Sequence, residues 1–395
     1  MKILYLLGIG PLPGNPNGGV FVQNRLQELQ SRNVDFKVWV PVDERRFLLR
    51  SLLLLLKKGS SVANWPEKST VRGIEYSYLP VKMGLFLRFA QFQKNSELFF
   101  REMRKRENWE NFTLIHSHWL FPHGHLAYLL SKEFGIPYIV HCHGSDINVI
   151  PQKYPKTLPL ILDALENATF ACFVSQKLVQ KAKEMGYSGN NVVVIPNGVN
   201  TCTFHPFVRT DTQKVLPESF QKGKVVGFVG NLNKTKRADR FPCLFEEIEK
   251  NSHPVSFLLV GDGKYRKSLE NRFRRKKNIF FTGSVSSEEV PFWISAMDVL
   301  ILPSRSEGFG CVSLEAQACG IPVVGSSVGG IPEAIGTGGI VVDEGAFFER
   351  EFSKRVAQVL VQNQFLPEEL RNRAKEFEWG RIVAREIDLY TRIQN

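Results

Sequence analysis

The stretch VLILPSRSEGFGCVSLEAQACGIPVVG, residues 299–325, decides the fold. An apolar run leads into a turn with two glycines, then into a helical pattern over residues 311–319, and then into a second apolar run at 323–325. Continuous runs of Val, Ile and Leu are typical of strands that are covered on both faces. The stretch therefore predicts a parallel strand–helix–strand unit with a sharp turn at the start of its helix.

The same alternation of apolar runs and helical patterns extends along both halves of the chain. It breaks around residues 197–224, so we expect two domains, residues 1–200 and 201–379. A last helix at 380–395 is expected to pack back on the first domain. The predicted fold class is α/β, with two doubly wound, Rossmann-like parallel-sheet domains facing a deep interdomain cleft. We expect strands at 3–7, 36–40, 74–78, 114–116, 138–141, 170–174, 192–195, 225–229, 256–260, 279–282, 299–302, 323–325 and 340–342.

The charge of the chain is uneven. Its 395 residues include 51 Lys and Arg against 39 Asp and Glu, a net charge of +12. Most of the excess lies in residues 45–106, which hold 14 basic and 4 acidic residues interleaved with Leu and Phe. A basic balance attracts polyanions such as nucleic acid, an anionic membrane surface or phosphorylated small molecules.

The basic region also contains an apolar run at 47–56, which is too short to span a bilayer. We expect residues 45–106 to dock on an anionic leaflet through mixed basic and apolar elements. The alternative is that these are ordinary core-facing helices with solvated basic faces.

The chain start and the cysteines indicate the compartment. Glycine and proline interrupt the apolar start MKILYLLGIGPLPG, residues 1–14, and no small-residue cleavage site follows, so it favours a buried strand over a signal peptide. The six cysteines form no CxxC pair, which is typical of free thiols in a reducing compartment. We therefore expect a cytoplasmic protein, peripheral at the inner face of the cell membrane. The same start reads GxGxxxG with two prolines, which argues against a nicotinamide enzyme.

The glycine turn before residues 311–319 is expected to bind an anion. Gly308 and Gly310 allow the backbone to approach a ligand closely, and the free N–H groups of the helix start would meet a phosphate. Glu307 and Glu315 flank this turn, and carboxylates suit the hydroxyls of a sugar or ribose better than a phosphate. The alternative is that Glu307 caps the helix and Glu315 is solvated.

A basic cluster, GNLNKTKR at residues 230–237, directly follows the expected strand at 225–229. Cations placed at the end of a strand can neutralise a diphosphate. The alternative is a solvated loop without a ligand.

Six of the eight histidines fall between residues 116 and 143. Their H-x-H pairs lie at strand ends without a Cys or carboxylate at zinc spacing, so we expect no metal. His118 and His143 lie in loops and are the functional candidates of this group. Earlier in the chain, Gly18 and Gly19 precede a helical pattern and form a flexible turn that tolerates an anion.

Together these motifs resemble those of the family 4 retaining glycosyltransferases of GT-B fold, of the bacterial envelope and exopolysaccharide type. The resemblance covers nearly the whole chain. Its most specific part is PSRSEGFGCVSLEAQACGIPVVGSSVGGIPE, residues 303–333, in which seven residues separate Glu307 and Glu315. Supporting motifs are HGSD at 143–146, VIPNGVN at 194–200, VGNLNKTKR at 229–237, LLVGDG at 258–263 and GSVSSEEVPFWISAMDVLILPS at 283–304.

The resemblance implies a role for each motif. Glu307 would contact the donor sugar, and Lys236 would bind the diphosphate. His118 would lie beside the donor sugar and complete the catalytic set. The donor-binding residues would be Gly18 and Gly19 in a mobile loop, Asn231, Arg237, Ser304, Gly308, Phe309, Gly310 and, at the ribose, Glu315; the acceptor-side candidates are His143, Ser145 and Asp146.

The chain departs from the family pattern at one place. The family usually has a basic residue directly after the glycine of the 229–237 motif, followed later by Lys-Gly. Here these positions are Asn231 and Lys236-Arg237. An uncompensated leaving dianion would be costly, so we expect Lys234 or Arg237 to supply the missing cation.

The implied reaction transfers a sugar from a nucleotide diphosphate to a glycan or lipid-linked acceptor with retention, and the leaving diphosphate takes the acceptor proton. It implies no metal and no cofactor, with a UDP-sugar favoured over a GDP-sugar as substrate. The alternatives are a sugar-nucleotide epimerase of the same fold and a noncatalytic nucleotide-sugar binding protein. No sequence signature supports nucleic-acid binding.

Overall fold

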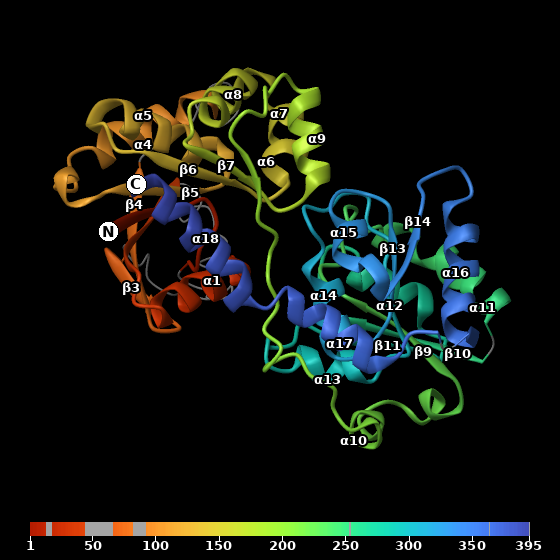
Figure 1. Ribbon diagram of the computed structural model, residues 1–395. Coiled ribbons are helices and arrows are strands. Elements are labelled where there is room, and N and C mark those ends of the chain that lie inside the picture. The colour runs from red at the N-terminus through yellow and green to blue at the C-terminus, as the bar shows by residue number, and fades with distance from the viewer. Residues whose placement is uncertain (13–17, 44–65, 82–91, 253, 363, 395) are drawn as a thin grey trace, which may run out of the picture. The chain divides into compact units, whose positions relative to one another are not determined.

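The computed structural model describes residues 1–12, 18–43, 66–81, 92–252, 254–362 and 364–394. The chain divides into two compact units (Figure 1). The first contains Met1–Ile195 and Val383–Asn395, and the second contains Pro196–Ile382. The boundaries expected from the sequence are residues 200/201 and 379/380.

The first unit is built on an eight-stranded sheet in the order β3-β4-β2-β1-β5-β6-β7-β8. Neighbouring strands are parallel except for β3 and β4. The seven strands expected in this half are all present. The strands are β1 (Lys2–Leu7), β2 (Asp35–Asp43), β3 (Lys68–Val71), β4 (Ile74–Val81), β5 (Leu114–His118), β6 (Tyr138–Cys142), β7 (Phe170–Phe173) and β8 (Val192–Val194).

Strand β3 was not expected from the sequence. It is an edge strand of four residues, and its residues alternate between exposed and half-buried, so it lacks an apolar run. The turn to β4 consists of Arg72 and Gly73, which both have positive φ, at 51° and 79°. Two positive φ values at the centre of a two-residue hairpin fit a type I′ turn, which matches the twist of the strands. The Arg-Gly pair was therefore the overlooked signal.

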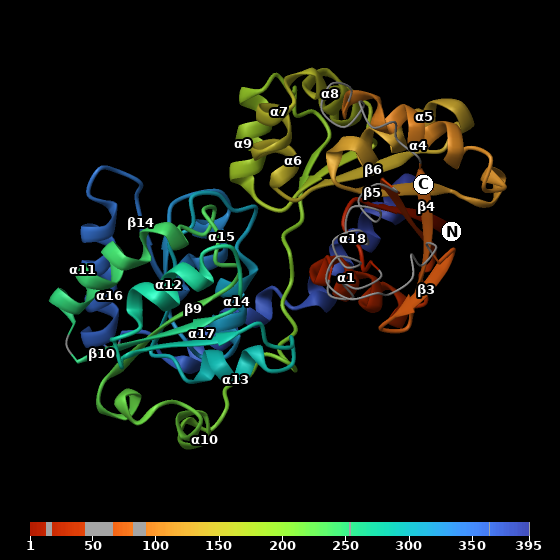
Figure 2. The same cartoon turned by 180° about the vertical axis from the view of Figure 1, so that it is seen from behind.

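Helices cover both faces of the first sheet (Figures 1 and 2). Helix α1 and the C-terminal helix α18 lie side by side on one face, where Arg25 and Glu386 form an ion pair. Helices α4, α5 and α8 lie on the other face. The helices of this unit are α1 (Val20–Ser31), α4 (Asn95–Met103), α5 (His125–Phe134), α6 (Ser145–Asn148), α7 (Ile150–Lys153), α8 (Leu158–Glu166), α9 (Gln176–Glu184) and α18 (Trp379–Gln394).

The second unit contains a six-stranded parallel sheet in the order β11-β10-β9-β12-β13-β14. All six strands expected in this half are present. They are β9 (Lys224–Val229), β10 (Val255–Val260), β11 (Ile279–Gly283), β12 (Val299–Leu302), β13 (Val323–Ser326) and β14 (Gly339–Val342). The helices are α10 (Arg209–Lys214), α11 (Phe241–Asn251), α12 (Arg266–Phe273), α13 (Val290–Ser295), α14 (Cys311–Ala318), α15 (Ile331–Ile335), α16 (Phe348–Gln362) and α17 (Pro367–Glu376).

The strands of the second sheet are buried on both faces, which explains their continuous apolar runs. Alternate residues of β9 enter different cores: Val226 and Phe228 pack with α11 and α16, whereas Val225 packs with α13, α14 and α15. The helices in Figure 2 accordingly lie on both sides of the sheet. This arrangement leaves the loops at the carboxyl ends of the strands as the places where a ligand can be bound.

The basic region 45–106 falls largely outside the described residues, since 44–65 and 82–91 are not described. In the described part, the apolar side chains Phe99 and Met103 of α4 are buried, and Ser96 donates to or accepts from the ring of His125. In α4, the burial of Phe99 and Met103 favours the alternative of a core-facing helix for these residues. In the part of the chain that is described, no helix combines the length and the apolar character needed to cross a membrane.

Candidate functional site

The loops at the carboxyl ends of the second sheet are joined by backbone hydrogen bonds. The N–H of Gly230 donates to Val260, and the N–H of Gly261 donates to Gly283. Gly261 has a φ of 133°, and a Cβ placed on it would lie 2.1 Å from the carbonyl oxygen of Gly230. Only glycine permits this close approach, so the loops after β9, β10 and β11 form one connected edge.

Lys236 and Glu307 form an ion pair at this edge, between Nζ and Oε1. The two side chains are 21% and 16% exposed, so the pair is sheltered but still reached by solvent. Ser304 adds its Oγ, 3.5 Å from the same carboxylate oxygen. The structure thus brings together three predicted site residues from two separate loops.

Helix α14 carries the next predicted carboxylate, Glu315, and begins at Gly310. Gly310 has a φ of 87° and the helix start receives no side-chain cap, which rules out Glu307 as the capping residue. Burial raises the pKa of the Glu315 carboxyl to about 7, and the positive charge of Lys236 opposes this rise. An uncapped helix start beside a lysine is a favourable place for an anion.

The remaining donor-side residues differ in their accessibility. Asn231 is exposed, whereas Phe309 is buried and packs on the ring of Phe377 with 5.9 Å between centroids. The carbonyl oxygen of Gly308 accepts the N–H of Gly330, which fixes the turn between β12 and α14. Phe309 can therefore meet a ligand through its backbone only.

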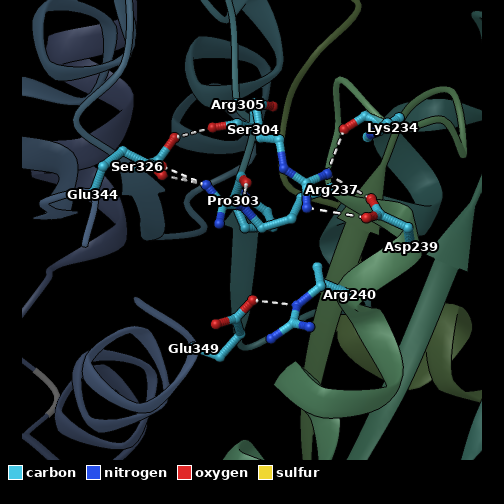
Figure 3. A network of polar contacts seen from close by, with 10 residues as sticks. All are labelled: Lys234, Arg237, Asp239, Arg240, Pro303, Ser304, Arg305, Ser326, Glu344 and Glu349. Carbon is cyan, nitrogen blue, oxygen red and sulfur yellow. Dashed lines mark hydrogen bonds and ion pairs between the residues drawn. The ribbon is translucent and has the colours of Figure 1, made fainter. Parts of the chain in front are cut away.

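Arg237 does not fill the place of the missing cation. Its backbone is left-handed, with a φ of 60°, and its side chain is buried. Figure 3 shows the polar contacts of its guanidinium. The guanidinium donates to both carboxylate oxygens of Glu344 and to the carbonyl of Pro303, and it lies 3.9 Å from the ring centroid of Phe348. The expectation that Arg237 binds the donor is therefore wrong for this arrangement, while Lys234 is exposed.

Sequence reasoning missed Arg305. Its backbone N–H donates to Thr235, and its Nη1 donates to the carbonyl of Lys234 at 2.7 Å. The same guanidinium forms a two-point ion pair with Asp239 (Figure 3). Burial would raise the pKa of Asp239, but Arg305 outweighs it and the pKa is lowered. Arg305 thus joins the loop of Glu307 to the loop of Lys236, and no motif in the sequence signals this role.

In the first unit, the predicted glycine turn precedes α1. Gly19 has a φ of 66°, and a Cβ on it would lie 2.7 Å from the carbonyl oxygen of Ile9. The carbonyl of Gly18 accepts a hydrogen bond from the side chain of Gln23. The local backbone therefore requires a glycine at position 19, independently of any ligand.

Four histidine rings form a stack on the face of the sheet that α1 and α18 cover. The H-x-H spacing places His116 and His118 of β5 on the same face, and His141 lies opposite His118 in the register with β6. The closest ring centroids lie 4.7 Å apart for His116 and His118, and 4.8 Å apart for His141 and His143. We call these four residues the histidine stack.

The two predicted functional histidines occupy different places in the histidine stack. His118 has no exposed surface, whereas His143 is 9% exposed. Their rings are joined by a hydrogen bond of 2.9 Å between His118 Nδ1 and His143 Nε2. Burial lowers the pKa of both rings well below the ordinary value, and Arg25 adds to this effect. The expectation that His118 itself touches the donor sugar is wrong here, because its ring is enclosed.

Helix α18 brings Glu386 to the histidine stack, which no local motif could have predicted. Glu386, His116, His118 and His141 offer possible metal-ligand atoms within 4.8 Å of one another. The carboxylate already accepts a hydrogen bond of 2.7 Å from Arg25, which brings a buried positive charge to the same place. The group is therefore neutralised by an arginine, although the expectation that no carboxylate accompanies the histidines is wrong.

The acceptor-side candidates also differ in their exposure. Asp146 is fully buried and accepts the backbone N–H groups of His143, Gly144 and Leu120. It therefore organises the loops after β5 and β6 and cannot touch an acceptor, which corrects its predicted role. Ser145 is exposed, and its Oγ accepts the indole N–H of Trp119 at 2.9 Å.

Comparisons with known proteins identify the family. Residues 18–202 match the family described as Glycosyltransferase Family 4, and residues 210–377 match the family described as Glycosyl transferases group 1. TuaC of Bacillus subtilis, assigned as a teichuronic acid biosynthesis glycosyltransferase, is 30% identical over 85% of this chain and 83% of its own. The chain is a family 4 glycosyltransferase.

Other relatives and solved structures agree with this family. The N-acetyl-alpha-D-glucosaminyl L-malate synthase of Bacillus anthracis is 28% identical to this chain. The match covers 70% of this chain and 73% of the synthase. In fold, this chain is similar to sucrose-phosphate synthase of Thermosynechococcus elongatus. The TM-score is 0.77 at 19% identity, and the match covers 100% of this chain and 99% of the synthase. HepE of Anabaena in complex with UDP gives a TM-score of 0.73 at 19% identity, covering 99% and 100%. The two parallel-sheet units are thus those of the GT-B fold.

Proposed function

We propose that this glycosyltransferase moves a sugar from a nucleotide diphosphate to an acceptor hydroxyl with retention of configuration. The observation that carries the proposal is the Lys236–Glu307 pair beside the uncapped start of α14. A diphosphate would take Lys236 and the helix start as its cationic partners, which releases Glu307 to accept hydroxyls of the sugar. Glu315, one turn into the same helix, would accept the ribose hydroxyls.

The proposed mechanism relies on electrostatic stabilisation of the leaving group. Negative charge develops on the diphosphate as the glycosidic bond breaks, and fixed cations and N–H dipoles stabilise that charge without rearranging. The leaving diphosphate takes the proton of the acceptor hydroxyl on the same face, so no side chain acts as base. Lys236 and Lys234 supply the charge in this proposal, which therefore requires neither a metal nor another cofactor.

The first unit contributes His143 to the proposed reaction. It is the member of the His118–His143 pair that retains some exposed surface, and its Nδ1 is buried without a hydrogen-bond partner among the described residues. A sugar hydroxyl both donates and accepts, so it would satisfy this atom in either protonation arrangement. The acceptor-side candidate of the sequence is thus proposed as a donor-sugar contact.

The proposed donor is a UDP-sugar and the proposed acceptor a glycan or a lipid-linked glycan of the cell envelope. The likeness of the fold to HepE, which was solved with UDP and with UDP-glucose, favours uridine nucleotides. The relationship to TuaC favours an envelope polysaccharide. The basic sequence of residues 45–106 favours action at the cytoplasmic face of an anionic membrane.

A donor screen tests the proposal. UDP-, GDP- and ADP-sugars are added to the full chain, and the midpoint of thermal unfolding is measured, since a ligand that binds the folded state stabilises it. We expect UDP-sugars to raise the midpoint most. The selected donor is then incubated with envelope glycan acceptors, and the anomeric configuration of the product is read by NMR.

Inversion at the anomeric carbon would contradict the retaining mechanism. Interconversion of the sugar nucleotide without an acceptor would identify an epimerase, and binding without turnover would identify a noncatalytic protein. Sedimentation of the full chain with anionic vesicles at low salt tests the membrane proposal, and a chain that stays in the supernatant would contradict it.

A further inference from the structure

We infer that His118 is a positioning residue, which fixes the orientation of the His143 ring and decides which nitrogen of His143 carries the proton. The direct observation is the hydrogen bond of 2.9 Å between His118 Nδ1 and His143 Nε2. The kinetic part of this inference rests on the proposed function, in which His143 meets the donor sugar. The structural part concerns the free protein and stands on the histidine pair alone.

The two rings share a single proton at their contact. Both are buried beside the positive charge of Arg25, so both are neutral, and each neutral imidazole has one donor and one acceptor nitrogen. When His118 donates from Nδ1, His143 must accept at Nε2 and carry its proton on Nδ1. When His143 donates from Nε2, its own Nδ1 becomes an acceptor and His118 carries its proton on Nε2. The protonation of one ring thus determines that of the other.

The two arrangements leave different atoms without a partner. His118 Nε2 and His143 Nδ1 both lack a hydrogen-bond partner among the described residues. A proton on His118 Nε2 would be an unmet donor on a ring with no exposed surface. A proton on His143 Nδ1 is also unmet in the free protein, because this atom is buried as well, although the His143 residue is 9% exposed. A ligand oxygen that meets His143 Nδ1 and accepts its proton would therefore select the arrangement in which His118 donates from Nδ1 to His143.

The surroundings of His118 hold it in place for this task. Its ring stacks on Tyr5 and His116 on one side and on His141 and His143 on the other. A flipped His118 ring would turn Nδ1 away and break the bond to His143. The position of His118 is thus set by neighbours that never meet the ligand.

Trp119 holds His143 from the opposite direction. Its indole lies 4.8 Å from the His143 ring and donates to Ser145 in the same loop. The backbone of Trp119 has φ 84° and ψ 132°, a region that side chains with a Cβ rarely adopt. Backbone strain of this kind persists where the surrounding structure requires it, and here it places the indole on His143.

The first test compares His118→Asn with His118→Leu, two side chains of nearly equal size. The amide of Asn can place an N–H donor near the position of Nδ1, whereas Leu cannot form a hydrogen bond. With the donor selected by the screen, we expect His118→Leu to lower kcat about tenfold or more with a smaller change in KM, and His118→Asn to restore most of it. Equal activity of Leu and Asn variants would overturn the inference.

The second test needs no substrate. The full chain is labelled with 15N in its histidines, and the ring nitrogen shifts, which differ between protonated and unprotonated nitrogen, are measured by NMR. We expect His118→Leu, which cannot donate a hydrogen bond, to change the ring nitrogen shifts of His143, and His118→Asn to keep them close to those of the original chain. The matched control is Tyr390→Phe, which removes a hydroxyl bonded to His116 in the same stack and leaves the His118–His143 pair intact. Unchanged His143 shifts in His118→Leu would overturn the inference. If His118→Leu fails to fold, His143 shifts in His118→Asn that place the proton on Nε2 would overturn it.

A failure of the proposed function can be told apart from a failure of the positioning role of His118. If Glu307→Gln keeps full activity, the proposed function is wrong, yet the NMR comparison still decides the role of His118. If Glu307→Gln loses activity while His118→Leu folds and turns over normally, the proposed function stands and the positioning role falls.

Discussion

In the first unit the histidine rings of the candidate site are buried and neutral, whereas in the second the Lys236–Glu307 pair is partly exposed and charged. The rings of the histidine stack lie close together, and their polar contacts go to one another and to the buried side chains of Arg25, Glu386 and Tyr390. In the Lys236–Glu307 pair both side chains retain some exposure, 21% and 16%. A partly exposed ion pair can exchange partners when an anion arrives, whereas a buried network is rigid and costly to disturb. In the proposed reaction, the first unit therefore orients histidine side chains, and the second unit stabilises the charge of the leaving group.

Lowering the pH should cause the largest difference in stability between the two units. The histidines of the stack have folded pKa values well below the ordinary value of 6.5, so the unfolded chain binds more protons. The stability that they contribute is present above pH 6.5 and is lost as the pH falls below it. From about pH 7 to about pH 5.5 the loss is roughly 1 kcal/mol for each ring, or about 4–5 kcal/mol together.

Glu315 changes the stability in the opposite direction with pH. Its pKa is raised to about 7, so ionising its carboxyl group costs stability as the pH rises from 4.5 towards 7. Acid therefore weakens the first unit and not this part of the second. Hydrogen exchange measured by mass spectrometry at both pH values locates the opening. Faster exchange at low pH in β9 and β12 than in β5 and β6 would contradict the comparison.

Breaking the buried ion pair of the first unit is the next largest effect. Arg25→Met leaves the carboxylate of Glu386 buried without its cation, and the expected loss is roughly 3–5 kcal/mol in the free energy of unfolding. Urea unfolding of the full chain measures it. The matched control in the same unit is Lys68→Met, because the Lys68–Glu75 pair is more than half exposed and its loss should change stability little. Equal losses in the two variants would show that burial is not what matters.

The charged pair of the second unit should respond in activity instead of stability. Glu307→Gln and Lys236→Met each remove a group proposed to act on the donor, and we expect kcat to fall by about 10²–10³, or roughly 3–4 kcal/mol. The free energy of unfolding should change little, because both side chains are partly exposed. Steady-state kinetics and urea unfolding are measured on the same preparations. Variants that unfold easily but keep their turnover would reverse the comparison.

The smallest expected effect concerns Arg305, which joins the loops of Lys236 and Glu307. Arg305→Ala should lower kcat/KM for the donor by about fivefold, corresponding to roughly 1 kcal/mol, because the two loops are less well aligned. Arg240→Ala is the control from the same network (Figure 3): it removes an ion pair with Glu349 that holds neither loop. If both variants lose the same activity, the effect is a general loss of charge.

The order of strands and helices could be predicted, because parallel strands that are covered on both faces carry long apolar runs. Strand β3 escaped this pattern, since an edge strand with half-exposed residues needs no such run. The glycines and glutamates of residues 303–333 could be found because they lie in one continuous motif. Arg305, Glu386 and the enclosure of His118 could not, since each depends on contacts between distant segments.

The sequence by itself determined the family, the two parallel sheets and the chemical character of each loop. Periodicity and motif spacing are local properties, and they are set before the chain folds. The tertiary structure alone decided which of these groups are accessible: it enclosed His118, left His143 partly exposed, and tied Arg237 to Glu344. The physical reason is that burial and pairing are set by neighbours from other parts of the chain, and these decide whether a polar side chain can meet a ligand.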